Sequence, residues 1–431
     1  MEQYSGKSDS KSNIRTELMA GFATFLAGMY IIVVNPSILE NTGMPFSAVL
    51  TATVLVSAFS SIFMGIYAKN PIMVAPGMGL NAFFAYSVVL GMGVAWETAL
   101  GAVFWSGIIF LLLSIFNVRT LIVQAIPKQI RYGVAAGIGL FITLIGLINA
   151  GFVVYDEATL VSRGQLSPAV LTFLAGLGVT SILLVFRIRG ALIIGIVLTT
   201  CIALPIGRWW GAEQVVSWKG IFAAADFSLI GRLDFVGSLK LSMLPVVFAF
   251  LFTDMFDSLS TFVGVAESGD LKDENGEPRN IRQSLIVDGF STTISGLLGS
   301  SPGTSYIESA VGIAEGGRSG TTAIVTGLLF LPFMFLSPLL SMVPIIATAP
   351  ALVLVGVFMM KPVSRIKWDT YEEAIPAFLA MVLIPLTYSI TQGIVWGFLS
   401  WTLLKVFRGK YQEVSPMLWV IDVFCILALL V

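Results

Sequence analysis

Residues 299–312 read Gly299-Ser300-Ser301-Pro302-Gly303-Thr304-Ser305-Tyr306-Ile307-Glu308-Ser309-Ala310-Val311-Gly312. This stretch is rich in Gly, Pro, Ser and Thr and carries one carboxylate, whereas the chain on both sides is strongly apolar. Backbone polar groups at membrane depth must be satisfied, so irregular chain survives there only where protein or a water-filled cavity surrounds it. The stretch therefore predicts a broken helix that faces a binding site.

The composition indicates a protein that crosses the lipid bilayer many times. Of its 431 residues, 56% are hydrophobic and 11% are charged, whereas soluble domains have about 25% charged residues. The formal net charge of −1 offers no basic surface for nucleic acid, which we do not expect as a partner. The chain has no histidine, so proton chemistry is expected to fall to carboxylates. The two cysteines lack metal-ligand spacing, and we predict no metal site.

Apolar runs close to the ~20 residues that a membrane-crossing helix needs predict fourteen spans. In the first half they are residues 17–35, 47–68, 72–90, 96–116, 129–152, 168–186 and 190–208. In the second half they are residues 242–264, 282–299, 303–317, 319–340, 342–360, 371–387 and 389–407. Most lysines and arginines then fall in loops on the side of the N-terminus, which places the N-terminus in the cytoplasm.

The same pattern divides the chain into five parts. We predict a cytoplasmic tail (1–15), a first repeat of seven segments (16–208), an extracytoplasmic connection (209–241), a second repeat of seven segments (242–407) and a C-terminal tail with a short apolar segment (408–431). Two halves with an odd number of spans run in opposite directions, and such inverted repeats place a substrate at the membrane midplane where discontinuous helices meet. The expected fold is therefore an all-α polytopic membrane protein in a 7+7 inverted repeat.

The two halves share a trace of this repeat. Residues 75–82 read APGMGLNA and open the third span, while residues 301–308 read SPGTSYIE and open the tenth. In each, a Pro-Gly pair leads within two turns to a side chain that could hold a ligand, Asn81 or Glu308. A lone Asn in a membrane helix could equally join two helices.

Three carboxylates are the strongest chemical signal. Asp254 and Asp257 lie three residues apart in the eighth span, hence on one helix face, and Glu308 follows the Pro-Gly pair of the tenth. Charges inside a membrane are costly and usually functional; the alternative is that one Asp, or Glu308, lies at the water surface. Carboxylates that share one low-dielectric cavity repel each other, so one of them is expected to hold an exchangeable proton near neutral pH. These groups predict a proton-coupled carrier for a planar heterocycle with ring N–H and ring N groups.

At these residues the chain resembles the nucleobase-ascorbate transporters, also called xanthine/uracil permeases, and within them the AzgA-like purine permeases. The resemblance covers residues 16–407 and rests on Asn35-Pro36, the run APGMGLNAFF at 75–84, the Asp254/Asp257 pair, Gly303-Thr304-Ser305 and Glu308-Ser309. It implies a core domain and a gate domain, with short strands in segments three and ten beside a base that binds near segment eight.

The resemblance also implies proton-coupled symport of adenine, guanine or hypoxanthine, with the proton as coupling ion and no organic cofactor. We expect the protein in a plasma membrane, namely a bacterial inner membrane. We do not expect it to be an enzyme. The residues expected to bind the base are Asn81, Asp254, Glu308, Gly303 and Thr304, and those expected in proton coupling are Asp257, Asp254 and Glu308. The preferred purine and the oligomeric state stay open, with a homodimer as one candidate.

Two other functions are weighed against this one. An anion carrier on the same scaffold would favour positive charge or helix N-termini at its site, and the predicted site holds carboxylates. An intramembrane aspartyl protease would use two aspartates from different helices, whereas Asp254 and Asp257 lie on one helix.

Overall fold

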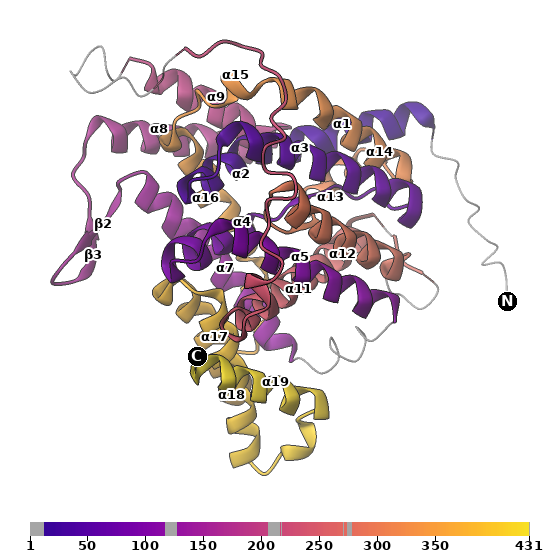
Figure 1. Cartoon of the computed structure of the whole chain (residues 1–431), viewed down its shortest axis with the longest axis vertical. Helices are drawn as coiled ribbons and strands as arrows, with labels where there is room; N and C mark the ends of the chain where they lie inside the picture. The colour runs from indigo at the N-terminus through magenta and orange to yellow at the C-terminus, as the bar shows by residue number, and fades with distance from the viewer. Residues whose placement is uncertain are drawn as a thin grey trace.

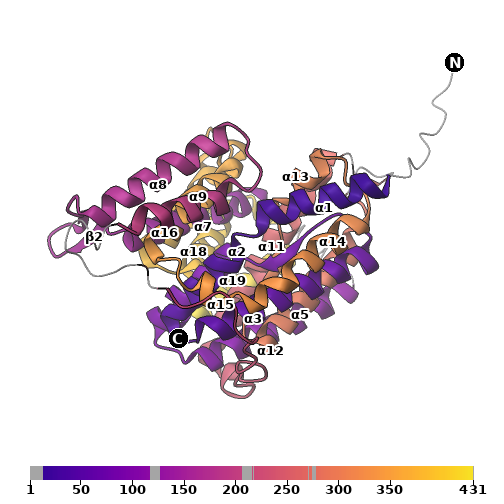
Figure 2. The same ribbon diagram turned by 90° about the horizontal axis from the view of Figure 1, so that it is seen from above.

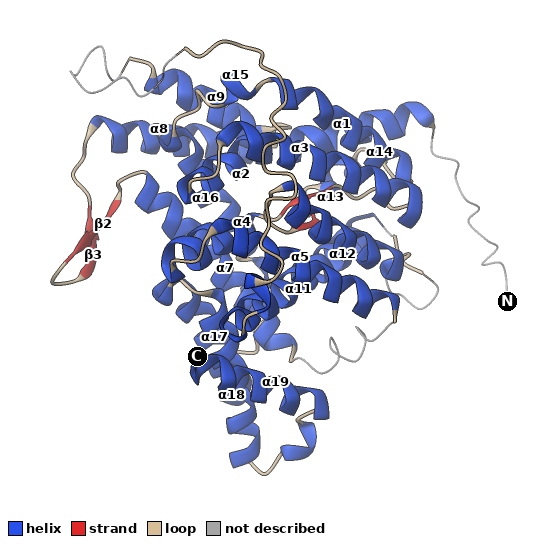
Figure 3. Ribbon diagram, in the orientation of Figure 1, coloured by secondary structure: helices blue, strands red, loops and turns tan. Residues whose placement is uncertain are grey.

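The computed structural model describes residues 13–116, 127–205, 216, 218–269, 271–273 and 278–430. Over these residues the fold is mostly helical, with two small two-stranded sheets (Figure 1; Figure 3). Residues 1–12 of the predicted cytoplasmic tail and most of residues 206–217, where the predicted outer connection begins, lie outside the described part.

The first half of the chain forms α1 (Ile14–Gly28), α2 (Ile31–Leu39), α3 (Phe46–Phe63), β1 (Val74–Pro76), α4 (Met78–Ala82), α5 (Trp96–Ile115), α7 (Lys128–Asn149), β2 (Val153–Asp156), β3 (Leu160–Arg163), α8 (Pro168–Val185) and α9 (Ala191–Ala203). Wider π-helical turns extend α3 over Met64–Ala68 and α4 over Phe83–Gly91. The hairpin of β2 and β3 was not predicted from the sequence.

The second half forms α11 (Leu244–Gly269), α12 (Ile281–Leu298), β4 (Gly303–Ser305), α13 (Ser309–Ala314), α14 (Gly320–Phe330), α15 (Ser337–Leu340), α16 (Ile345–Met359), α17 (Tyr371–Thr387), α18 (Ile390–Phe407) and α19 (Pro416–Leu430). Short 3₁₀ turns lie at Glu40–Thr42, Gly237–Leu239, Leu241–Met243, Leu331–Phe335, Lys361–Arg365 and Tyr411–Glu413. The run after residue 416, left undecided by the sequence, is thus a helix that packs on α18 and α11.

Among the described residues, eight helices are long and apolar enough to cross a membrane. Several of the other predicted spans are shorter, as in the helical runs Met78–Gly91, Ala191–Ala203 and Gly320–Phe335, whereas α12 is an unbroken helix of 18 residues that is less apolar. The first predicted span is also divided, into α1 and α2, by a break at residues 29 and 30. Gly28 lies at this break, where a Cβ would come within 2.2 Å of the Met73 side chain.

The helices pack as two groups. One contains α1, α3, α5, α12, α13 and α14, and the other contains α7, α8, α9, α16, α17 and α18. Figure 2 shows the groups side by side, with α2 and α11 between them. α11 contacts α5 and α13 in the first group and α18 in the second. Its side chains can therefore reach the boundary between the groups.

The two broken segments meet as a small antiparallel sheet. β1 pairs with β4 in the register Val74↔Ser305, Ala75↔Thr304 and Pro76↔Gly303, and all six residues are buried. The pairing continues at both ends, because Gly77 N donates to Pro302 O at 2.9 Å and Tyr306 N donates to Met73 O at 2.9 Å. Each broken segment thus supplies the backbone partners that lipid could not supply to the other.

Candidate functional site

A cavity of about 1280 Å³ lies at the boundary between the two helix groups, beside the end of the β1–β4 sheet. Its walls come from α4, α11 and the residues around β4 on one side, and from α7 and α16 on the other. The polar and charged residues of this wall include Tyr30, Asp257, Thr304, Ser305 and Glu308. The cavity therefore lies where the polar stretch of the sequence predicted a site.

Glu308 occupies the start of α13, directly after the strand β4, and is half-buried. Its Oε1 accepts a hydrogen bond of 2.8 Å from the hydroxyl of Tyr30, which is 1% exposed and lies at the break between α1 and α2. The bond fixes the Glu308 carboxyl by one oxygen. Since Glu308 also lines the cavity, its carboxyl can contact a ligand there.

The two aspartates of α11 have different surroundings. Asp257 is half-buried and lines the cavity. Asp254 is fully buried behind β4, away from the cavity wall, and its Oδ2 accepts a hydrogen bond from the hydroxyl of Thr292 on α12. A three-residue spacing turns successive side chains by about 60° around a helix, which is enough to separate the two.

Asn81 does not line the cavity either. It is fully buried on α4, where its Oδ1 accepts a hydrogen bond from the Ser301 hydroxyl. Ser301 also donates to Asn35 Oδ1 at 3.3 Å, and Asn35 Nδ2 donates to Thr53 Oγ1 at 2.8 Å. This network connects α2, α3 and α4 to the start of β4. In this conformation the structure places Asn81 as a support of the sheet.

Gly303 and Thr304 are the first two residues of β4, the strand between the cavity and α12. Thr304 lines the cavity, and its hydroxyl lies 3.0 Å from that of Ser258 on α11. Gly303 O accepts a hydrogen bond of 3.1 Å from Thr292. A Cβ at Gly303 would lie 2.1 Å from Ser291 Oγ, so β4 can approach α12 this closely only with glycine there.

Three functional candidates were missed by the sequence. Asp288 is fully buried in the centre of α12, and its Oδ1 accepts a hydrogen bond of 2.9 Å from Ser305. The rule that flagged Asp254, a carboxylate inside a predicted span, would have found it too. Tyr30 and Arg131, unlike Asp288, line the cavity, and the guanidinium carbon of Arg131 lies 5.7 Å from the centre of the Phe256 ring.

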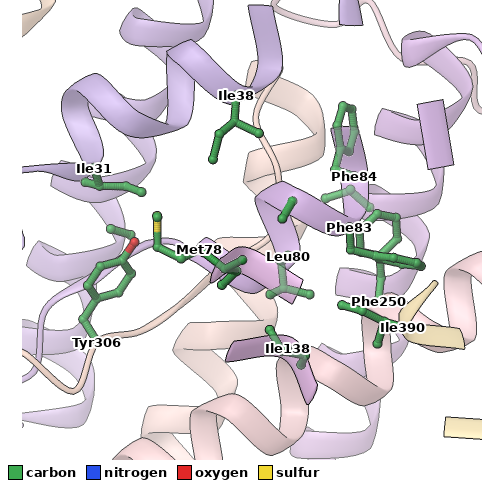
Figure 4. Close-up of a cluster of buried hydrophobic side chains, with 14 of the residues drawn as sticks. Ile31, Ile38, Met78, Leu80, Phe83, Phe84, Ile138, Phe250, Tyr306 and Ile390 are labelled. Carbon is green, nitrogen blue, oxygen red and sulfur yellow. The ribbon is translucent and has the colours of Figure 1, made fainter. Parts of the chain in front are cut away.

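Apolar side chains close the site from the side of α4. In Figure 4, Met78 and Tyr306 lie on one side of this helix segment and Leu80, Ile138 and Phe83 on the other. Gly79 lets α4 approach α7, because a Cβ there would come within 2.4 Å of Ile138. Phe83 packs in the core against Phe250 with ring centres 4.9 Å apart. The wall on this side is therefore closely packed and apolar.

Comparison with known proteins gives concordant matches along the chain. The profile of a family described as "Permease family" (Xan_ur_permease) matches residues 15–396. The adenine permease AdeP of Escherichia coli (strain K12) is 43% identical over 416 residues, which cover 96% of this chain and 92% of that protein. The guanine/hypoxanthine permease PbuO of Bacillus subtilis (strain 168) is 41% identical over 428 residues, which cover 97% of each.

Among solved structures, the transmembrane domain of the cyanobacterial bicarbonate transporter BicA matches with a TM-score of 0.68 and 16% identity. The match covers 90% of this chain and 98% of that one. At this level of identity the likeness concerns the fold alone. It confirms the predicted polytopic helical fold with short strands at its broken segments.

Proposed function

The chain belongs to the nucleobase-ascorbate transporter family of permeases, and from that membership we propose that it carries purine nucleobases into the cell together with protons. A permease of this family is not an enzyme, which excludes the alternative of an intramembrane aspartyl protease. The two curated relatives are named for adenine and for guanine and hypoxanthine, and what these substrates share is the purine ring.

The observation that carries the proposal is the pair of carboxylates, Asp257 and Glu308, in one cavity beside the hydroxyl of Thr304. A purine presents ring N–H groups, which a carboxylate oxygen accepts, and ring nitrogens, which a hydroxyl or a protonated carboxyl can donate to. The apolar wall around Met78 suits the faces of the ring. We assign the base to Glu308, Asp257, Thr304 and the backbone near Gly303, with Asn81 holding the sheet and Asp254 serving proton coupling.

Proton coupling is supported by the kind of group that the chain places in its membrane interior. With no histidine in the sequence, the groups of the cavity wall that can exchange a proton near neutral pH are carboxylates such as Asp257 and Glu308. A carboxylate that takes up one proton when the base binds would return it when the base leaves. A proton needs only such a carboxylate, whereas a metal cation as coupling ion would need a set of several ligands.

The residues at the mouth of the cavity suggest the side of the membrane to which it opens. Lys128, Lys272, Lys361 and Arg365 line it, and all four belong to loops that the positive-inside pattern assigns to the cytoplasm. We therefore assign this structure to a cytoplasm-facing state in a bacterial inner membrane, with the N-terminus inside. The basic rim could also attract an anion, but the carboxylates deeper in the cavity disfavour an anion as cargo.

Uptake of radiolabelled adenine, guanine and hypoxanthine into cells that lack their own purine permeases tests the proposal. We expect saturable uptake of at least one base, competition among purines and loss of accumulation when an uncoupler collapses the proton gradient. Uptake of labelled sulfate or bicarbonate that excess purine leaves unchanged would contradict it. Light scattering of the purified protein in detergent distinguishes a monomer from the homodimer that the sequence leaves open.

A further inference from the structure

Behind the cavity wall lies a second pair of carboxylates, formed by Asp254 on α11 and Asp288 on α12. Both side chains are fully buried. In the described part of the chain, Asp254 Oδ1 and Asp288 Oδ2 have no hydrogen-bond partner, while the opposite oxygen of each accepts one hydroxyl. Each carboxylate is therefore half satisfied, a costly arrangement for a buried charge.

The two carboxylates are close enough to interact. Thr292, whose hydroxyl donates to Asp254 Oδ2, lies four residues after Asp288 on α12, so both carboxylates lie on the same stretch of the contact between α11 and α12. Two negative charges this close in a low-dielectric interior repel strongly, and one proton relieves the repulsion. The pair is therefore suited to hold a single proton.

Cations do not neutralise the pair within the described residues. The elements packed on α12 carry Glu97 on α5, Tyr67 after α3, and Asp254 and Asp257 on α11. Those packed on α11 add Glu308 at α13, Lys405 on α18 and Asp422 on α19. Lys405 is bound to Glu372, Glu373 and Glu413. Arg282, on α12 itself, donates to Ile115 O. Neither carboxylate of the pair has a cationic partner among the described residues, and a proton is the charge that can compensate it.

Hydroxyl groups connect the pair to the cavity. The Thr304 hydroxyl lies next to Asp254, the Ser258 hydroxyl lies next to Asp288, and the two hydroxyls are 3.0 Å apart. Ser305, which lines the cavity, donates directly to Asp288. A hydronium ion in the cavity can give a proton to Ser305 Oγ while the hydroxyl proton of Ser305 passes to Asp288 Oδ1. Ser305 then ends with one proton, as before, and Asp288 becomes a neutral carboxyl.

We propose that Asp254 and Asp288 together hold the transported proton, while Asp257 and Glu308 contact the base. This assignment rests on the proposed function, and it gives a role to a residue, Asp288, that does not itself line the cavity. Because the pair lies directly behind β4, its charge acts on the strand that carries Thr304 and Ser305. The proton and the base can therefore influence each other across a single strand.

The test compares Asp288→Asn, Asp254→Asn and the control Asp422→Asn in proteoliposomes. Asp422 is also a buried membrane aspartate, but it lies on α19. Two quantities are measured with whichever labelled purine the wild type carries: exchange of base without a pH gradient, and accumulation driven by an imposed pH gradient. Wild-type protein that exchanges no purine would overturn the proposed function itself, separately from this assignment.

We expect both pair variants to retain exchange and to lose gradient-driven accumulation by about tenfold or more, inside the ~5- to 150-fold range of coupling between two sites. Asp422→Asn should behave as wild type in both assays. Accumulation at the wild-type level in Asp288→Asn would overturn the assignment, and so would an equal loss of exchange and accumulation in a folded variant. If Asp288→Asn does not fold, Ser305→Ala tests the assignment in its place. This variant should slow accumulation more than exchange. An equal effect on both would refute proton transfer through Ser305 to Asp288.

Discussion

The hydroxyl of Tyr30 donates a hydrogen bond of 2.8 Å to Glu308 Oε1, although the two residues are 278 positions apart in the chain. Tyr30 is at the break between α1 and α2, and Glu308 is at the break after β4, so one bond joins two interrupted segments. The bond gives the Glu308 carboxyl a fixed orientation in the cavity.

Tyr30→Phe removes this hydroxyl and little else. A hydrogen bond to a charged group is worth about 1.5–3 kcal/mol, so we expect the KM for the base to rise by roughly tenfold or more while the maximal rate changes less. Tyr132→Phe, at the opposite wall on α7, is the matched control. A double-mutant cycle with Glu308→Gln should show strong coupling, because Tyr30 acts through Glu308. Additive effects in that cycle would contradict a positioning role.

Asp257→Asn and Glu308→Gln should weaken base binding directly. Both carboxylates line the cavity, and a ligand that binds only the folded state raises stability by RT ln(1 + [L]/Kd). The rise in melting temperature that saturating purine gives the wild-type protein should therefore shrink or vanish in both variants. A full ligand-induced shift in Asp257→Asn would remove Asp257 from the binding residues.

Gly303→Ala tests the close packing of β4 on α12. The new Cβ would lie 2.1 Å from Ser291 Oγ, and overpacking of this kind typically costs about 1–3 kcal/mol. Gly178→Ala on α8 is the control, since a Cβ there meets nothing within 4 Å. We expect a lower melting temperature in detergent for Gly303→Ala alone, with partial recovery when Ser291→Gly is added. Equal melting temperatures for the two alanine variants would refute the prediction.

Lys405 on α18 joins α17 to the turn Tyr411–Glu413 through a network of ion pairs. Its side chain is 3% exposed, and Nζ lies 2.6 Å from Glu413, 3.0 Å from Glu373 and 3.4 Å from Glu372. Removing one member of a buried pair typically costs about 3–5 kcal/mol, so Lys405→Met should lower the melting temperature clearly. Lys410→Met, whose side chain is 37% exposed, should have a much smaller effect.

The same network has a defined pH dependence. The hydrogen bond from Lys405 lowers the pKa of the Glu413 carboxyl below its usual value of 4.5. A group with a lowered folded-state pKa stabilises the protein above its unfolded pKa and loses that effect as pH falls through the folded value. The difference in melting temperature between wild type and Lys405→Met should therefore narrow as the pH is taken from 7 to below 4.5. A difference that stays constant would show that Glu413 contributes nothing to it.

Much of the fold follows from the spacing of apolar runs, because membrane thickness sets the length of a span. The predicted spans at 96–116, 282–299 and 389–407 differ from α5, α12 and α18 by one residue at each boundary or less. The sequence also predicted that 75–82 and 301–308 would correspond, and their strands pair. The hairpin of β2 and β3 was missed because its eight residues lie in a predicted loop with no strong alternation of polar and apolar positions.

The site was harder to predict than the fold. Composition identifies Asp254, Asp257 and Glu308 as unusual residues, but the direction of each side chain depends on tertiary packing. Asp257 and Glu308 lie in the cavity wall, whereas Asp254 and Asn81 lie behind it. Asp288 was missed because it is a single acid in its span and has no partner nearby in the sequence.

The sheet of β1 and β4 sets an order of events during synthesis. Tyr306 donates a hydrogen bond to Pro76 O from 230 positions further along the chain, and such distant contacts form late because the intervening chain must first be made and closed into a loop. The backbone groups of β1 therefore have no strand partner until β4 has been synthesised. Nascent chains that stop before residue 303 should contain every helix of the first repeat and yet be unable to recognise a base.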